Sequence, residues 1–181
     1  MQTKFSIRLF CFLAVGVTAL SGALFKPGAW YATLVKPVWT PPNLVFPIAW
    51  TALYLVIAVV GILLFEGPFR ILKRLWVLQL ALNGLWSWLF FGQHWILFGM
   101  LDMVLLLAII GWLAVLAFPR NKVAAWLLIP YLAWVSYAST LNLGIYVLNA
   151  NQDRNARACT TLPEGAKGIT SSNASAPVNS C

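Results

Sequence analysis

Acidic side chains, histidine and cysteine are all scarce in this 181-residue sequence, which holds four Asp and Glu, one His and three Cys. So few ligands exclude an acidic or histidine-rich metal centre, and we expect no metal site. Cys11, Cys159 and Cys181 are too scattered for a metal-spacing pair or a disulfide framework. His94 lies in a short turn, whereas most serines of the first 150 residues lie in apolar runs, so no Ser-His-Asp arrangement can form. The sequence therefore contains no conventional catalytic constellation.

Charge of either sign is also limited, since charged residues make up 9% of the chain and hydrophobic residues 61%. This balance excludes an ordinary soluble domain. The net charge of +8 does not indicate a nucleic-acid-binding protein, because Lys and Arg occur singly or in short groups at the ends of apolar runs. Basic residues in those places act as lipid-headgroup and topology signals. We therefore expect the lipid bilayer, and no nucleic acid, as a partner.

Long uncharged apolar runs are what the sequence does contain. A membrane-spanning helix needs about 20 apolar residues, and its backbone groups must pair within the helix because hydrocarbon offers no partners. Five runs fit this requirement, at about residues 9–25, 44–65, 75–91, 96–118 and 123–148. The sequence therefore predicts an all-α integral membrane protein built as a five-transmembrane-helix bundle.

The two ends of the chain admit further predictions. Lys4 and Arg8 precede the first run as in a secretory signal, but that run exceeds the usual signal core of about 7 to 15 residues, so we expect a retained helix. The N-terminus and the second and fourth loops carry more Lys and Arg than the other side, which favours a cytoplasmic N-terminus. We expect a transmembrane domain over 1–150 and a polar, disordered tail over 151–181, which is rich in Ser, Asn and Ala.

The first loop, residues 26–43, has four prolines that forbid a long helix. Trp30, Tyr31 and Trp39 supply the amphipathic rings expected at headgroup depth. We therefore predict that this loop is an ordered lid on the membrane-embedded bundle.

Three of the predicted helices each carry an aromatic and hydrogen-bonding stripe at helical spacing. The stripes are Pro47, Trp50, Thr51 and Tyr54; Gln79, Asn83, Trp86, Ser87 and Phe90; and Pro130, Trp134, Tyr137, Ala138, Leu141 and Asn142. At roughly 1.5 Å per residue, Trp50, Asn83 and Trp86 all lie within about 12 Å of the first-loop side. The stripes either line a ligand site or pack the bundle, since polar side chains also join membrane helices.

Asp102 is the one acid well inside a predicted span. A carboxylate in hydrocarbon costs at least about 2.5 kcal/mol, so we expect it to be protonated or paired with an interior donor such as Asn83. A functional role and a structural one both remain open for this buried acid.

Four ordered motifs resemble the TspO family, also called the translocator protein, tryptophan-rich sensory protein or peripheral benzodiazepine receptor family. The motifs are Trp30 to Pro42, Pro47 to Tyr54, Gln79 to Gly92 and Pro130 to Asn142, within a match over about residues 5–150. The resemblance implies a five-helix, usually dimeric protein whose pocket lies under the first loop and binds porphyrins and synthetic hydrophobic drugs. It also implies that Trp50 and Trp134 take part in tetrapyrrole chemistry.

By the same resemblance, Trp39, Asn83 and Ala138 fall on pocket or cap positions. The family's sterol motif is incomplete here, because Leu143 follows Asn142 and the first basic residue, Arg154, lies outside the motif's spacing. A sterol is therefore the less favoured ligand. For bacterial members the resemblance implies a cytoplasmic C-terminus, which opposes the charge count, so the orientation stays open. We expect a bacterial cell membrane, with the mitochondrial outer membrane as the alternative.

The favoured hypothesis is a membrane receptor or carrier for porphyrins and related flat hydrophobic ligands, with protoporphyrin or haem as ligand and no required cofactor. The alternatives are light- and oxygen-dependent porphyrin degradation through Trp50 and Trp134, and a proton-coupled small-molecule or sterol transporter using Asp102. The expected ligand-binding residues are Trp39, Trp50, Tyr54, Asn83, Trp86, Trp134, Ala138 and Leu141.

Overall fold

The computed structural model describes residues 2–161 and the side chains of residues 4–150. All regular structure in this part of the chain is helical, with no strand. The elements are α1 (Gln2–Leu24), α2 (Ala29–Thr33), α3 (Val45–Phe65), α4 (Arg70–Ser87), the π-helical turn η1 (Trp88–Gly92), α5 (Ile96–Ala117) and α6 (Lys122–Thr161).

Five helical segments are long and apolar enough to cross a membrane, which confirms the predicted five-helix membrane bundle. They are Lys4–Leu24, Val45–Phe65, Arg70–Gly92, Ile96–Ala117 and Lys122–Ala150. The third begins earlier than the apolar run predicted, because α4 includes Arg70, Lys73 and Arg74 in its first turns. Long basic side chains can extend toward the headgroups from such positions while the backbone remains helical.

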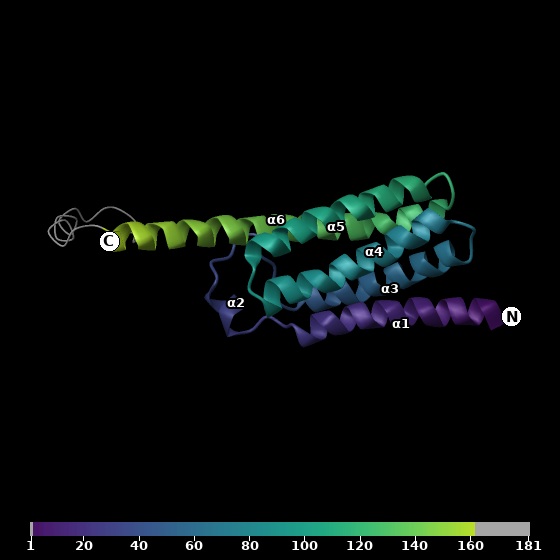
Figure 1. The fold of residues 1–181 in the computed structure, drawn as a ribbon, viewed down its shortest axis with the longest axis horizontal. Coiled ribbons are helices and arrows are strands. Elements are labelled where there is room, and N and C mark those ends of the chain that lie inside the picture. The colour runs from purple at the N-terminus through teal and green to yellow at the C-terminus, as the bar shows by residue number, and fades with distance from the viewer. Residues whose placement is uncertain (1, 162–181) are drawn as a thin grey trace.

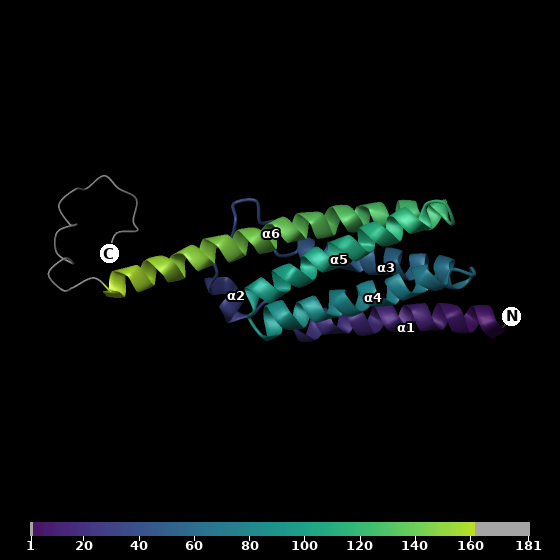
Figure 2. The ribbon, with the colours of Figure 1, turned by 45° about the horizontal axis from the view of Figure 1, so that its top comes forward.

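The long helices run side by side along one direction (Figure 1 and Figure 2). Helix α5 packs against α4 and α6, α3 packs against α6 and α1, and α1 also packs against α4. The N-terminus, the α3–α4 connection and the α5–α6 connection lie at one end of the bundle, which we call the basic end. The segment with α2 and the connection from η1 to α5 lie at the opposite end, which we call the loop-one end.

Helix α3 meets α4 in the core through Gly61 and Trp76. The Trp76 side chain is fully buried, and its Nε1 donates a hydrogen bond to the Ile57 carbonyl oxygen at 2.9 Å. A Cβ atom at Gly61 would overlap the Trp76 ring, so only glycine lets the indole lie against the α3 backbone. Small residues at membrane-helix contacts allow this close approach.

The last helix extends past the boundary expected for the transmembrane domain. Helix α6 continues to Thr161 and projects beyond the rest of the bundle at the loop-one end (Figure 1). The predicted tail began at residue 151, and its part from 162 to 181 lies outside the described residues.

Candidate ligand-binding site

A chain of hydrogen bonds crosses the interior and joins α3, α4 and α6. The Tyr54 hydroxyl donates to Asn83 Oδ1 at 3.0 Å, and Asn83 Nδ2 donates to the Tyr131 hydroxyl at 2.9 Å. Tyr131 in turn donates to Gln79 Oε1 at 2.9 Å. Tyr131, Asn83 and Gln79 are buried. The amides of α4 therefore face protein, as their helical spacing predicted, and they fix the packing of three helices.

Trp50 and Trp134 both lie at the contact between α3 and α6. The Trp50 ring lies 5.5 Å from the Tyr54 ring and 6.5 Å from the Tyr131 ring, centroid to centroid. Trp134, one turn beyond Tyr131, lies 6.0 Å from the ring of Phe46 on α3. Both tryptophans are partly buried and pack against the core. The two helices thus hold a band of aromatic rings beside the hydrogen-bonded chain.

Trp86 belongs to a second aromatic cluster, beneath the first loop. Its ring stacks on Phe90 at 5.3 Å with an interplanar angle of 14°. Phe90 then meets Trp30 of α2 edge-on at 5.7 Å. Trp86 and Phe90 are one turn apart, where α4 passes into η1. The wider π-helical turn is the kind of local irregularity that often occurs at functional positions.

Asp102 and Asn142 place polar groups at the contact between α5 and α6. A Cβ atom at Gly99 would lie 3.7 Å from Asn142 Nδ2, so the amide lies against α5 one turn from Asp102. Both side chains are buried. We expected Asp102 to be either protonated or paired with an interior donor such as Asn83. Among the described residues the Asn83 amide donates to Tyr131, and Asp102 Oδ2 has no hydrogen-bond partner, so protonation stays the open alternative.

Toward the loop-one end of the bundle, several buried polar atoms have no hydrogen-bond partner among the described residues. They include Trp86 Nε1, Trp134 Nε1, Asp102 Oδ2 and both amide atoms of Asn142. An unpaired buried polar group costs about 1–3 kcal/mol, so such atoms are usually satisfied by protein, water or ligand. Indole and amide N–H groups are donors. The N–H groups among these atoms are therefore available to hydrogen-bond acceptors from outside the described chain.

The first loop is attached to α6 at three levels. Val35 exchanges two hydrogen bonds with Asn149, and the Tyr137 hydroxyl donates to the Trp39 carbonyl oxygen at 2.8 Å. Between them, Pro37 is buried against α6 at Gly144, where a Cβ atom would overlap the proline ring. Trp39 remains 52% exposed, so the structure holds this residue by its backbone at the edge of the bundle.

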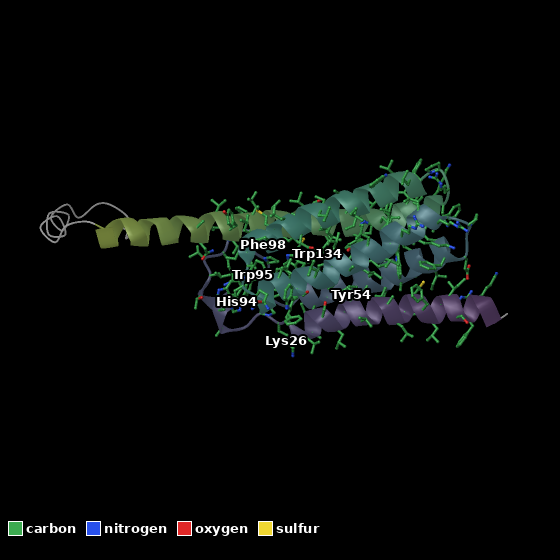
Figure 3. The ribbon with its side chains drawn as sticks, viewed as in Figure 1. Lys26, Tyr54, His94, Trp95, Phe98 and Trp134 are labelled. Atoms are coloured by element: carbon green, nitrogen blue, oxygen red, sulfur yellow. The ribbon has the colours of Figure 1, made fainter. Side chains whose placement is uncertain are left out.

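The other end of the loop packs against η1 and the turn before α5. Trp30 stacks on His94 with ring centroids 4.1 Å apart, and Figure 3 shows His94 beside α2. His94 has a positive φ of 59°, a backbone conformation that non-glycine residues adopt infrequently. Tyr31 contacts Phe91 edge-on at 5.5 Å, and burial raises the Tyr31 pKa above its ordinary value.

The predicted stripes were partly misplaced. Ala138 and Leu141 are buried as expected, but Thr51 and Pro130 are exposed, because the interior faces of α3 and α6 are rotated slightly from the predicted ones. Tyr131, the central residue of the hydrogen-bonded chain, was not predicted from the sequence. Its spacing from Ala138 and from Asn142 is helical, so the signal was present but was assigned to the neighbouring Pro130.

The fold and this interior define a class: a multi-pass integral membrane protein that gathers aromatic and amide side chains beneath a docked loop. The sequence profile of the TspO/MBR family matches residues 9–148, and the chain belongs to this family. It is 37% identical over 154 residues to "Protein CrtK" of Rhodobacter capsulatus, covering 81% of this chain and 96% of that protein.

Two further relatives show how widely the family is distributed. "Tryptophan-rich protein TspO" of Chlorobaculum tepidum is 44% identical over 146 residues, which cover 76% of this chain and 90% of the relative. The human "Translocator protein" is 32% identical over 143 residues, which cover 74% and 85% of the two chains. The similarity to bacterial members supports the expected location in a bacterial cell membrane.

Proposed function

We propose that this protein is a membrane receptor or carrier for flat, hydrophobic ligands of the porphyrin type, which bind among α3, α4 and α6 beneath the first loop. The observation that carries the proposal is the group of unpartnered interior donors, Trp86 Nε1, Trp134 Nε1 and Asn142 Nδ2, beside two aromatic clusters. Indole faces stack on a macrocycle, while the N–H groups can donate to its nitrogen or carboxylate acceptors. The names "sensory protein" and "translocator protein" of the relatives suit a ligand receptor or carrier.

Charge at the loop-one end fits the acidic edge of such a ligand. Lys36 lies with Nζ 4.6 Å from the centre of the Tyr31 ring and donates to the Leu34 carbonyl oxygen. Lys26 is exposed at the start of the loop (Figure 3). Either ammonium can pair with a carboxylate at the mouth of the site, while the macrocycle remains in apolar surroundings. Ligand entry requires displacement of the loop, because the loop is docked on α6 and η1.

A titration of the purified full-length protein with protoporphyrin, followed by the Soret absorbance, tests the proposal. Trp134→Phe removes one interior donor and should weaken binding about 2- to 10-fold, the value of one net hydrogen bond. Trp112→Phe is the matched control, because Trp112 is 56% exposed on α5 and should leave affinity unchanged. Equal affinities of Trp50→Phe, Trp134→Phe and the parent protein would contradict the proposed site.

Illumination of the same samples in air separates a receptor from an enzyme. A receptor leaves the Soret band intact relative to detergent alone. A light-dependent loss of the band that needs Trp50 or Trp134 and yields a defined product would instead assign porphyrin degradation to this site.

A further inference from the structure

An apolar groove lies between α5 and α6 on the outer side of the bundle, away from the candidate site. Its volume is about 510 Å³. The α5 wall includes Gly111, Val115 and Phe118, and the α6 wall includes Trp126, Ile129 and Leu132. Val115 is 69% exposed and Trp126 is 65% exposed, so the groove opens toward the surrounding lipid.

Glycine creates the inner end of this groove. A Cβ atom at Gly111 would meet only Leu132 Cδ2, at 3.9 Å, so the space above the α5 backbone is open because a side chain is missing. Gly111 and Phe118 are two turns apart on α5, which gives the groove a length of about 10 Å. That length covers much of the roughly 15 Å of hydrocarbon in one leaflet. The groove therefore has the dimensions for the upper part of one acyl chain.

Two cations stand at the outer end of the groove, in the α5–α6 connection at the basic end. Pro119 is part of the groove wall, and Arg120 follows it with Nη1 donating to the Leu116 carbonyl oxygen at 2.7 Å. The guanidinium thus folds back over the last turn of α5. Lys122 precedes Trp126 by four residues, so it continues the α6 stripe that forms the other wall. Both basic side chains are exposed.

Within residues 4–150, whose side chains the structure describes, no acid is placed to neutralise these cations. Glu66 and Asp102 are the acids within residues 4–150, and Glu66 already pairs with Arg8 at 3.7 Å. Asp102 is buried among the interior side chains. A second copy of this chain would bring the same cations together, because two parallel subunits in one bilayer join at equal depth. The positive groove end thus favours an anionic occupant.

From these observations we infer that the groove binds one anionic glycerophospholipid, with its phosphate between Arg120 and Lys122 and one acyl chain along Gly111, Val115 and Ile129. Trp126 lies about 6 Å below Lys122, at the depth where indoles contact the glycerol region. Basic pockets between membrane helices bind anionic headgroups through this combination of charge and apolar contact. The site is separate from the proposed porphyrin site, which lies inside the bundle.

Native mass spectrometry of the detergent-purified full chain tests the inference with phosphatidylglycerol and phosphatidylcholine of identical acyl chains. The parent protein should retain phosphatidylglycerol preferentially. Arg120→Gln with Lys122→Gln should weaken phosphatidylglycerol binding about 10- to 30-fold and leave phosphatidylcholine nearly unchanged. The control pair Arg70→Gln with Arg74→Gln removes the same charge from the same end on α4, and should leave the preference intact.

Filling the groove tests the acyl-chain part. Gly111→Leu should weaken the binding of both lipids several-fold. Val115→Phe should fill the groove from a position that is 69% exposed. Gly16→Leu is the matched control, because nothing lies within 4 Å of a Cβ atom at Gly16. A normal protoporphyrin titration of each variant, or a normal thermal midpoint where porphyrin does not bind, shows that the bundle is intact.

Three results would overturn the inference. If the Arg120/Lys122 and Arg70/Arg74 double variants lose phosphatidylglycerol binding equally, the lipid is held by a diffuse surface attraction and not by a site. Unchanged lipid binding in both filling variants would show that the groove is unoccupied. Light scattering gives the oligomeric state of Gly111→Leu. If this variant changes from a dimer to a monomer and still binds lipid, the groove is a contact between two copies of the chain.

Discussion

Asn149 holds the backbone of Val35 through both of its amide atoms. The Val35 N–H donates to Asn149 Oδ1 at 3.1 Å, and Asn149 Nδ2 donates back to the Val35 carbonyl oxygen at 3.0 Å. The two residues are 114 positions apart in the chain. The Asn149 amide thus pairs with both backbone groups of Val35, as the backbone of a neighbouring β-strand would. This contact lies where α6 extends beyond the bundle.

Asn149→Ala should loosen the first loop, because both hydrogen bonds to Val35 are lost. Each neutral hydrogen bond contributes about 0.5–1.5 kcal/mol, and exposure to solvent reduces that value. Hydrogen–deuterium exchange of peptides within 26–43 should accelerate about 3- to 10-fold. Asn43→Ala, in an exposed part of the same loop, is the control and should exchange like the parent. Identical exchange in all three proteins would show that the Asn149 contact does not hold the loop.

Gly144→Ala should displace the first loop by a steric route. The added Cβ atom would overlap Pro37 and lie 3.3 Å from Trp39 Cζ2, so the loop must move away from α6. Limited proteolysis in the loop should become faster, and bound porphyrin should dissociate sooner. Gly16→Ala makes the same change on α1 where no atom lies within 4 Å. If Gly144→Ala and Gly16→Ala are cleaved at equal rates, the Pro37 contact does not position the loop.

Tyr131→Phe should destabilise the bundle, because the hydroxyl both accepts from Asn83 and donates to Gln79. Its loss leaves two buried amide atoms unpaired, at a cost of about 1–3 kcal/mol. The thermal midpoint in detergent should fall by about 2–12 °C. Tyr146→Phe is the control on the same helix. A fall of the same size in both variants would exclude a special contribution from the hydrogen-bonded chain.

Asp102→Asn should keep the fold, with at most a modest loss of stability, because the amide preserves the shape of the side chain and one acceptor. The thermal midpoint should change by less than about 3 °C, and porphyrin affinity should stay the same. Uptake into proteoliposomes under a pH gradient is the decisive measurement. A stable variant that binds normally but has lost pH-driven uptake would assign a proton-coupling role to Asp102 and contradict the structural role.

The candidate site divides into residues that periodicity predicts and contacts that it does not. Asn83, Ala138 and Leu141 are buried as their spacing indicated, since a helix brings every third or fourth residue to one face. The suggested pairing of Asp102 with Asn83, one of two alternatives, does not occur among the described residues, because the Asn83 amide donates to Tyr131. Spacing gives the face of one helix, whereas a hydrogen bond between helices also depends on the rotation and height of the neighbouring helix.

The sequence by itself determined the membrane location, the five helices and most of their bounds. Long apolar runs have one stable form in hydrocarbon, because backbone groups there can pair only within a helix. The tertiary structure alone decided that Tyr131 joins Asn83 to Gln79, that Asn149 holds Val35 and that Gly111 opens a groove below Arg120 and Lys122. Each of these contacts depends on how separate helices rotate and slide against one another, and close packing of whole faces sets that arrangement.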